Sequence, residues 1–287
     1  MTDAFPLFTS IPPNSNFGPV VENWRELGFR VISINNRKEA AHLFGVETIT
    51  VDTDELKLPI SDMLNAIRET GEPFAGIINA DCKFLAPIDF DVIRRCARKS
   101  VILAERIDVD DQGAPALFRA NGFDAMFFDA SAIKDLKKNS AFKIGMPWWD
   151  YWLPTAFHYV GFQIKKFDCP ILTHEVHPVH WNDRYTFMML AEDFKADFPD
   201  HPAVYLGDKL APTVYRNLLE SPTISATQIP LPIVKIMSGV PQIVTQASKR
   251  WNWRELSILR PLRLLWREYK MLRIKQSRSH ERASKML

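Results

Sequence analysis

Two polar side chains follow a short apolar run in the first third of the chain. Phe74–Ile78 come after Gly71 and Pro73, and this apolar run predicts a buried strand. Asn79 and Asp81 follow it, and side chains at i and i+2 of an extended segment point the same way. Ligands of open α/β sheets bind beyond the carboxyl ends of the strands. The pair is therefore a candidate site for a divalent cation or a sugar-phosphate; a plain Asx turn is the alternative.

A second cluster combines aromatic rings with one carboxylate. Trp148, Trp149 and Trp152 surround Asp150 within five positions. Indole rings offer flat apolar faces to a sugar or a base, with an N–H group at the edge. A carboxylate beside them can accept a hydrogen bond from a hydroxyl or remove its proton. The alternative is a helix start whose tryptophans pack into the core, with Asp150 as a buried cap.

Other ionisable groups are weaker candidates. Asp124 stands inside the apolar run 122–129, and a buried carboxylate there needs a partner. The acidic stretch 105–113 is a second metal-facing loop or a solvated turn, and its composition favours the turn. His174 and His177 are followed by Pro178, which argues against a continuous helix carrying a three-histidine zinc site. A single histidine that completes a metal shell begun by Asp81 fits better.

The elements that must position these groups alternate along the chain. Four strand patterns alternate with three helix patterns within about 80 residues. This order predicts an α/β domain with a mainly parallel sheet flanked by helices. No G-x-G-x-x-G follows the first strand and no G-x-x-x-x-G-K-[ST] occurs, so a Rossmann dinucleotide site or a P-loop is not expected. We expect strands at 6–9, 29–34, 47–51, 74–78, 100–104, 122–129 and 170–174, and helices at 20–27, 37–44, 59–70, 91–99, 131–138, 182–194 and 207–219.

Charge divides the chain into regions. Residues 249–287 contain twelve Lys or Arg and three Glu, a net charge of +9, whereas the whole chain carries +2. Apolar residues at 258, 262, 265, 269 and 272 make one stripe of a basic amphipathic helix. Such a helix suits an anionic membrane surface, and packing or oligomerisation is the alternative; nucleic acid is less expected because no recognition fold accompanies the charge. We expect a domain over 1–220, a proline-containing linker over 221–248 and this tail.

Composition favours a cytoplasmic protein. Three cysteines without paired spacing fit a reducing compartment. The N-terminus has no basic and apolar leader, and no run is long enough to cross a bilayer. A peripheral position on the inner face of the membrane would follow from the tail.

Taken in order over about residues 5–195, these features resemble a GT-A-fold glycosyltransferase that uses a nucleotide-sugar. The resemblance covers the loop after the first strand, the Ser33-Ile34-Asn35-Asn36 turn, Asn79-Ala80-Asp81, the strand around Asp124 and the tryptophan segment with Asp150. In that family an Asp-x-Asp motif binds ribose and a Mn²⁺ or Mg²⁺ held by the diphosphate. Asn79 departs from this pattern and leaves Asp81 as the firm metal ligand.

The resemblance implies a role for each candidate residue. It implies that Asp150, or second Asp124, is the base, that Asp81 and His177 hold the metal, and that the acceptor, a saccharide or a lipid-linked molecule, binds the tryptophans. The donor would contact Thr9, Ser10, Ile11, Pro12, Asn35, Asn36, Arg37, Asn79, Ala80 and Asp81, and the acceptor would contact Trp148, Trp149 and Trp152.

Two other functions fit the same residues. A metal-dependent phosphoester hydrolase would use Asp81, Asp108, His174 and His177 on a two-metal centre. A non-catalytic, membrane-associated binding protein would keep the fold without needing Asp81 or Asp150.

Overall fold

The computed structural model describes residues 4–12, 17–37, 45–53, 55, 57–110, 113, 122–139, 141–176 and 184–226. The chain divides into two units, Met1–Met237 and Ser238–Leu287, and the described residues all belong to the first. The predicted tail over 249–287, most of the predicted linker and residues 38–44 of a predicted helix lie outside them. Within the described residues, no helix has the length and apolar character needed to cross a bilayer.

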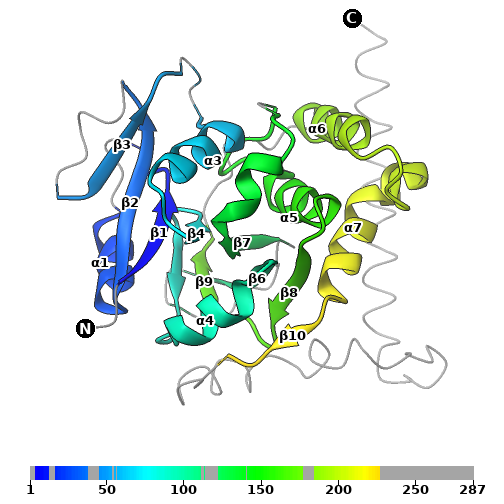
Figure 1. The fold of residues 1–287 in the computed structure, drawn as a ribbon. Helices are drawn as coiled ribbons and strands as arrows, with labels where there is room; N and C mark the ends of the chain where they lie inside the picture. The colour runs from blue at the N-terminus through cyan, green and yellow to red at the C-terminus, as the bar shows by residue number, and fades with distance from the viewer. Residues whose placement is uncertain are drawn as a thin grey trace, which may run out of the picture. The chain divides into compact units, whose positions relative to one another are not determined.

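A mixed central sheet organises the first unit (Figure 1). Its strand order is β10-β8-β6-β7-β4-β1-β2-β3. β7 is antiparallel to both of its neighbours, and the other pairs along this order are parallel. The predicted α/β fold with a mainly parallel sheet is thus confirmed. The strands span Phe5–Thr9 (β1), Phe29–Asn36 (β2), Glu47–Val51 (β3), Phe74–Ile78 (β4), Ser100–Val109 (β6), Phe123–Asp129 (β7), Gln163–Phe167 (β8) and Thr223–Ile224 (β10).

Strand β6 is twice as long as the sequence predicted. Its first half pairs with β7 and β8, the register shifts between Ala104 and Glu105, and the second half pairs with β9 (Leu172–Glu175). β9 also pairs with β5 (Cys82–Phe84). The predicted turn starting at Glu105 is therefore wrong as far as Val109, because β9 supplies backbone partners that no local signal reveals.

Helices cover both faces of the sheet. Alternate side chains of a strand point to opposite faces, so Phe8 and Ile32 join one apolar core while Leu7 and Val31 join the other. The first core is completed by α3 (Ile60–Glu69), α5 (Trp149–Tyr159), α6 (Arg184–Asp197) and α7 (Leu210–Leu219), and the second by α1 (Gly18–Glu26) and α4 (Phe90–Ala97). The short 3₁₀ segments are η1 (Ala130–Asp135) and η2 (Val204–Lys209).

Two predicted boundaries need correction. The expected helix over 131–138 is the 3₁₀ turn η1, where the Asp129 carboxylate accepts a hydrogen bond from the backbone N–H of Ser131. The sheet also continues past the predicted domain end at residue 220, because Thr223 and Ile224 pair with Lys166 and Phe167 of β8.

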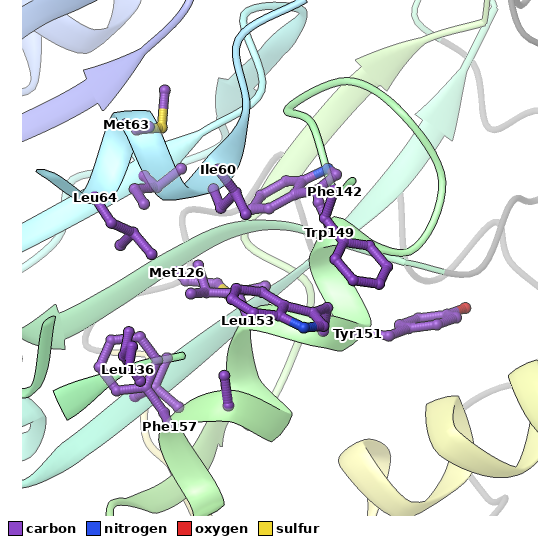
Figure 2. Close-up of a cluster of buried hydrophobic side chains, with 14 of the residues drawn as sticks. Ile60, Met63, Leu64, Met126, Leu136, Phe142, Trp149, Tyr151, Leu153 and Phe157 are labelled. Carbon is purple, nitrogen blue, oxygen red and sulfur yellow. The ribbon is translucent and has the colours of Figure 1, made fainter. Parts of the chain in front are cut away.

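The tryptophan segment belongs to the core. Trp148, Trp149 and Trp152 are 1%, 2% and 0% exposed. Figure 2 shows Trp149 of α5 beside Phe142, close to Ile60 of α3. The Trp152 ring lies 5.3 Å from that of Phe142, and its N–H donates to Asp197. The predicted alternative, a helix start packed into the core, is therefore the one observed.

We expect Trp152→Ala to destabilise the protein by about 3–5 kcal/mol, because it leaves a large cavity in the core. It also removes the hydrogen bond that the Trp152 N–H group donates to Asp197, whose side chain is 6% exposed. Urea denaturation measures the change. Tyr205→Ala is the control, since Tyr205 is 85% exposed, and it should change stability by less than about 0.5 kcal/mol. A Trp152 variant as stable as the control would contradict this account of the core.

Candidate functional site

The carboxyl ends of β1, β2 and β4 meet at one edge of the sheet. These strands are parallel, with Leu7 beside Gly76 and Thr9 beside Ser33. Thr9, the last residue of β1, and Asn79, the residue after β4, therefore lie at the same edge. Each has a buried side-chain oxygen without a hydrogen-bond partner: Oγ1 of Thr9 and Oδ1 of Asn79. A buried polar atom of this kind is costly, and an added ligand hydroxyl or N–H group could satisfy it.

The loop after β1 is held against β2 by side chains. The backbone N–H of Ile11 donates to Ser33 Oγ over 3.0 Å, and Asn35 Nδ2 donates to the Ile11 carbonyl over 2.8 Å. The Ser33 hydroxyl donates to Asn35 Oδ1. Asn35 is fully buried, and its side chain fixes this loop against β2.

The other predicted donor-binding residues differ in accessibility. Asn36 is buried and donates to the Glu55 carbonyl over 3.1 Å. Arg37 is exposed and pairs with Asp52 at 3.3 Å. Ser10 and Ala80 are half-buried, Ile11 is buried and Pro12 is exposed. The loop, β2 and β4 therefore present a mixture of backbone and side-chain groups at the edge of the sheet.

A chain of hydrogen bonds and ion pairs connects Asn79 to Asp81. Asn79 Nδ2 donates to Asp124 Oδ1, and Arg106 Nη1 donates to Asp124 Oδ2. Arg106 Nε donates to Asp108 Oδ1 over 2.8 Å. The chain ends at His174 and Asp81: His174 Nδ1 lies 3.0 Å from Asp108 Oδ1, and its Nε2 lies 3.5 Å from Asp81 Oδ2. Because the two ends, Asn79 and Asp81, are two positions apart in the sequence, we call these six residues the ion-pair ring.

The ring keeps its two basic members charged. Burial acts to lower the pKa of Arg106, but the carboxylates of Asp124 and Asp108 outweigh burial and raise it. Burial likewise lowers the pKa of His174, while its hydrogen bonds to Asp108 and Asp81 raise it, with a net result of about 9. At neutral pH His174 is therefore an imidazolium that can donate from both ring nitrogens.

Asp124 was expected to need a partner for its buried carboxylate, and the structure shows that this partner is Arg106. Asp124 is 4% exposed, and each of its oxygens accepts a hydrogen bond within the ring. Burial raises the pKa of Asp124, and Arg106 acts in the opposite sense. Because both oxygens already accept hydrogen bonds, Asp124 is less suited than Asp150 to act as a base. Its carboxylate positions Asn79 instead.

Asp150 lies at the start of α5, beside Asp124. Trp148, the residue before the helix, has φ of 74°, an uncommon conformation for a bulky side chain. The Trp148 indole N–H donates to the Phe187 carbonyl over 3.0 Å and holds this turn. The backbone N–H of Phe123 donates to Asp150 Oδ2 over 3.1 Å, and a Cβ at Gly122 would meet that oxygen at 2.8 Å. Glycine at 122 therefore makes room for the carboxylate.

Asp150 has the proton affinity of a group that exchanges protons near neutral pH. Burial and then the nearby Asp124 charge raise its pKa to about 7, although the Phe123 N–H group and Arg106 act in the opposite direction. The residue as a whole is half-buried. A carboxyl with such a pKa suits a general base.

Lysine 57 is a cation that the sequence analysis missed. Its amine donates to the Gly145 carbonyl over 3.2 Å. Burial lowers its pKa, and the charge of Asp81 acts in the opposite direction. The Lys57 amine is therefore near enough to Asp81 to interact with its charge.

Of the predicted site residues, the structure brings Thr9, Asn79, Asp81, Asp124 and Asp150 to one region. The predicted contact of an acceptor with Trp149 and Trp152 is wrong, because both rings are buried in the core. Trp148 is also buried, yet it borders a cavity of about 490 Å³ with Tyr151, Phe187 and Met188. His177 lies outside the described residues.

Arg106 was not expected at the site, and Asp108 was expected there only for the alternative hydrolase function. They lie two positions apart on β6 and point the same way, which an alternating pattern of polar and apolar residues would have indicated had 105–109 been recognised as a strand.

Of the predicted metal site, the described residues contain Asp81 but not His177. The Asp81 side chain is 31% exposed, so its carboxylate is available to a cation. The part of the chain that the structure describes has no group of three or more His, Cys, Asp or Glu able to hold a metal. The described residues alone therefore offer a cation at Asp81 few ligands, and the oxygens of a diphosphate could supply others.

Comparisons with known proteins give similarity of fold only. No family model and no curated protein matches the chain. S. aureus TarS 1–349, solved in complex with UDP-GlcNAc, is 10% identical over 84% of this chain and 82% of its own, with a TM-score of 0.47. HddC from Yersinia pseudotuberculosis, complexed with GMP-PN, is 9% identical over 67% of this chain and 100% of its own, with a TM-score of 0.35. These matches agree with the GT-A-like resemblance at the level of fold, and at such values they carry no inference about activity.

We expect Asp150→Asn to remove a pH-dependent loss of stability. The folded pKa of about 7 lies above the ordinary value of 3.8, so the folded protein keeps a proton that the unfolded chain loses. Stability therefore falls as the pH rises through this window, by on the order of 2 kcal/mol between pH 5 and 8.

Urea denaturation of both proteins at pH 5 and pH 8 measures this effect. The variant should gain stability relative to the natural chain as the pH rises, whereas Asp200→Asn, at an exposed position, should follow the natural chain. Parallel pH dependence of the Asp150 variant and the natural chain would show that the carboxyl titrates normally.

Proposed function

We propose that the protein is a glycosyltransferase that moves a sugar from a nucleotide-sugar to a hydroxyl of a saccharide or lipid-linked acceptor, in the synthesis of cell-surface polysaccharide or glycolipid. The observation that carries the proposal is the position of Asp150. This carboxyl, with a pKa of about 7, lies beside Asp124, which binds the Asn79 amide at the carboxyl end of β4. A candidate base therefore lies in the same region as buried side-chain oxygens that could accept hydrogen bonds from a nucleotide-sugar.

The arrangement supports a direct displacement. The acceptor oxygen forms a bond to the anomeric carbon while its proton moves to the Asp150 carboxylate. The bond from that carbon to the diphosphate breaks, and the electron pair leaves with the nucleoside diphosphate. Asp150 must be unprotonated to take the proton, which a pKa of about 7 permits at neutral pH.

Negative charge that develops on the diphosphate needs a positive partner. A bound Mn²⁺ or Mg²⁺ would neutralise it as a Lewis acid, with Asp81 as the described residue that would hold the ion. Lys57 and the His174 imidazolium lie near Asp81 and add positive charge from the protein itself.

The rival hydrolase is less well supported. Asp81, Asp108 and His174 do lie together, as that function requires. However, each ring nitrogen of His174 faces a carboxylate, so neither is free to bind one of two metal ions.

We expect one nucleoside diphosphate to raise the melting temperature, and Mn²⁺ to increase the shift. UDP, GDP and CMP, with the corresponding nucleotide-sugars, are tested by thermal shift with and without Mn²⁺. Asp81→Asn should lose the increment due to Mn²⁺, because it removes the charged cation ligand. Asp200→Asn is the control and should behave as the natural chain. If no nucleotide changes the melting temperature of the natural chain, the proposed function is wrong.

We expect Asp150→Asn to lower the rate of nucleoside diphosphate release at least about 100-fold, since general-base catalysis contributes about 10²–10⁴. The donor should still bind, because the amide oxygen can accept from Phe123 as the carboxylate does. In the natural chain the rate should fall as the pH drops below about 7, when Asp150 gains a proton. Coupled detection of the released diphosphate measures both. A rate within a few-fold of the natural chain would exclude Asp150 as the base.

A further inference from the structure

The amide of Asn79 is held in one orientation by Asp124. Asp124 uses Oδ1 to accept from Asn79 Nδ2 and Oδ2 to accept from Arg106. Turning the amide over would bring its oxygen against the Asp124 carboxylate, which has no proton to donate while it is paired with Arg106. The opposite end of the amide, Oδ1, is thereby left buried and without a partner.

An aspartate at position 79 would conflict with this arrangement. Two carboxylates would then face each other at hydrogen-bond distance, and one of them would have to bind a proton. The neighbouring groups give little relief, because Arg106 already faces two carboxylates, Asp124 and Asp108. The ion-pair ring carries three carboxylates, one guanidinium and one imidazolium, so another carboxylate adds to an existing negative excess.

We propose that Asp124 requires a hydrogen-bond donor at position 79, and that Asn79 thereby presents its oxygen as a neutral acceptor for a hydroxyl group of the bound ligand. The identity of this group rests on the proposed function: for a nucleotide-sugar, it is a ribose or sugar hydroxyl. Asp124 is then a positioning residue that acts through Asn79. The same ring reaches Asp81 through His174, so it orients both polar residues that follow β4.

The pairing can be reversed without changing its geometry or its charge. In the double variant Asn79→Asp with Asp124→Asn, the new amide at 124 can donate to the carboxylate at 79. Its own oxygen can still accept from Arg106. The double variant has the net charge of the natural chain, whereas Asn79→Asp alone is one unit more negative and Asp124→Asn alone one unit more positive.

The test compares four ligand-free proteins: the natural chain, the two single variants and the double variant. We expect each single variant to melt several degrees lower than the natural chain at pH 8, and the double variant to regain most of the loss. Asn79→Ala, which removes the donor without adding a charge, should lose less than Asn79→Asp. A double variant that melts as low as the worse single variant, or an Asn79→Asp variant as stable as the natural chain, would overturn the proposal. If a single variant does not fold, recovery of folding in the double variant decides the same question.

Calorimetric titration supplies the ligand arm, with whichever of UDP, GDP or CMP stabilises the natural chain. Asn79→Asp should weaken binding at least tenfold, and so should the double variant, which restores the pairing with position 124 but still presents a charged carboxylate at position 79. Equal binding by Asn79→Asp and the natural chain would overturn the role of Asn79 as a neutral acceptor. If the natural chain binds none of the nucleotides, the proposed function fails, while the ligand-free melting temperatures still decide whether Asp124 requires a donor at 79.

Discussion

The buried ion pair between Arg106 and Asp124 is the contact on which the rest of the site depends. Their side chains are 14% and 6% exposed, and each charge would be costly to bury without the other. Arg106 belongs to β6 and Asp124 to β7, so the pair joins two strands that are neighbours in the sheet. From this pair, hydrogen bonds extend to Asn79 in one direction and through Asp108 and His174 to Asp81 in the other.

The antiparallel strand β7 makes this connection possible. Because it runs opposite to β4, its first residues lie beside the last residues of β4, as the pairing of Ile78 with Ala125 shows. The amino end of β7 therefore contributes Asp124 and the Phe123 N–H group to the same edge at which parallel β1, β2 and β4 end. A parallel strand in this position would have placed those groups at the opposite edge of the sheet.

The environment, more than the residue type, separates the roles of the carboxylates. Asp124 is fully engaged by two donors, Asp81 is partly exposed and faces an imidazolium, and Asp150 is anchored by one backbone N–H group beside the Asp124 charge. These differences give Asp150 a pKa of about 7. The same residue type thus occupies three environments, which suit a structural anion, a candidate cation ligand and a candidate base.

The sequence by itself determined the alternation of strands and helices, because apolar periodicity and Gly and Pro boundaries are local. It identified the bounds of β3 and β4, Asn79 and Asp81 as polar groups after an apolar segment, and Asp150 as a carboxylate among tryptophans. Tertiary structure decided what local patterns do not encode: that β6 continues through Arg106 and Asp108, that β7 is antiparallel, and that Trp149 and Trp152 face the core. Each of these depends on partners more than 20 positions away, so the free energy that selects them comes from long-range pairing and burial.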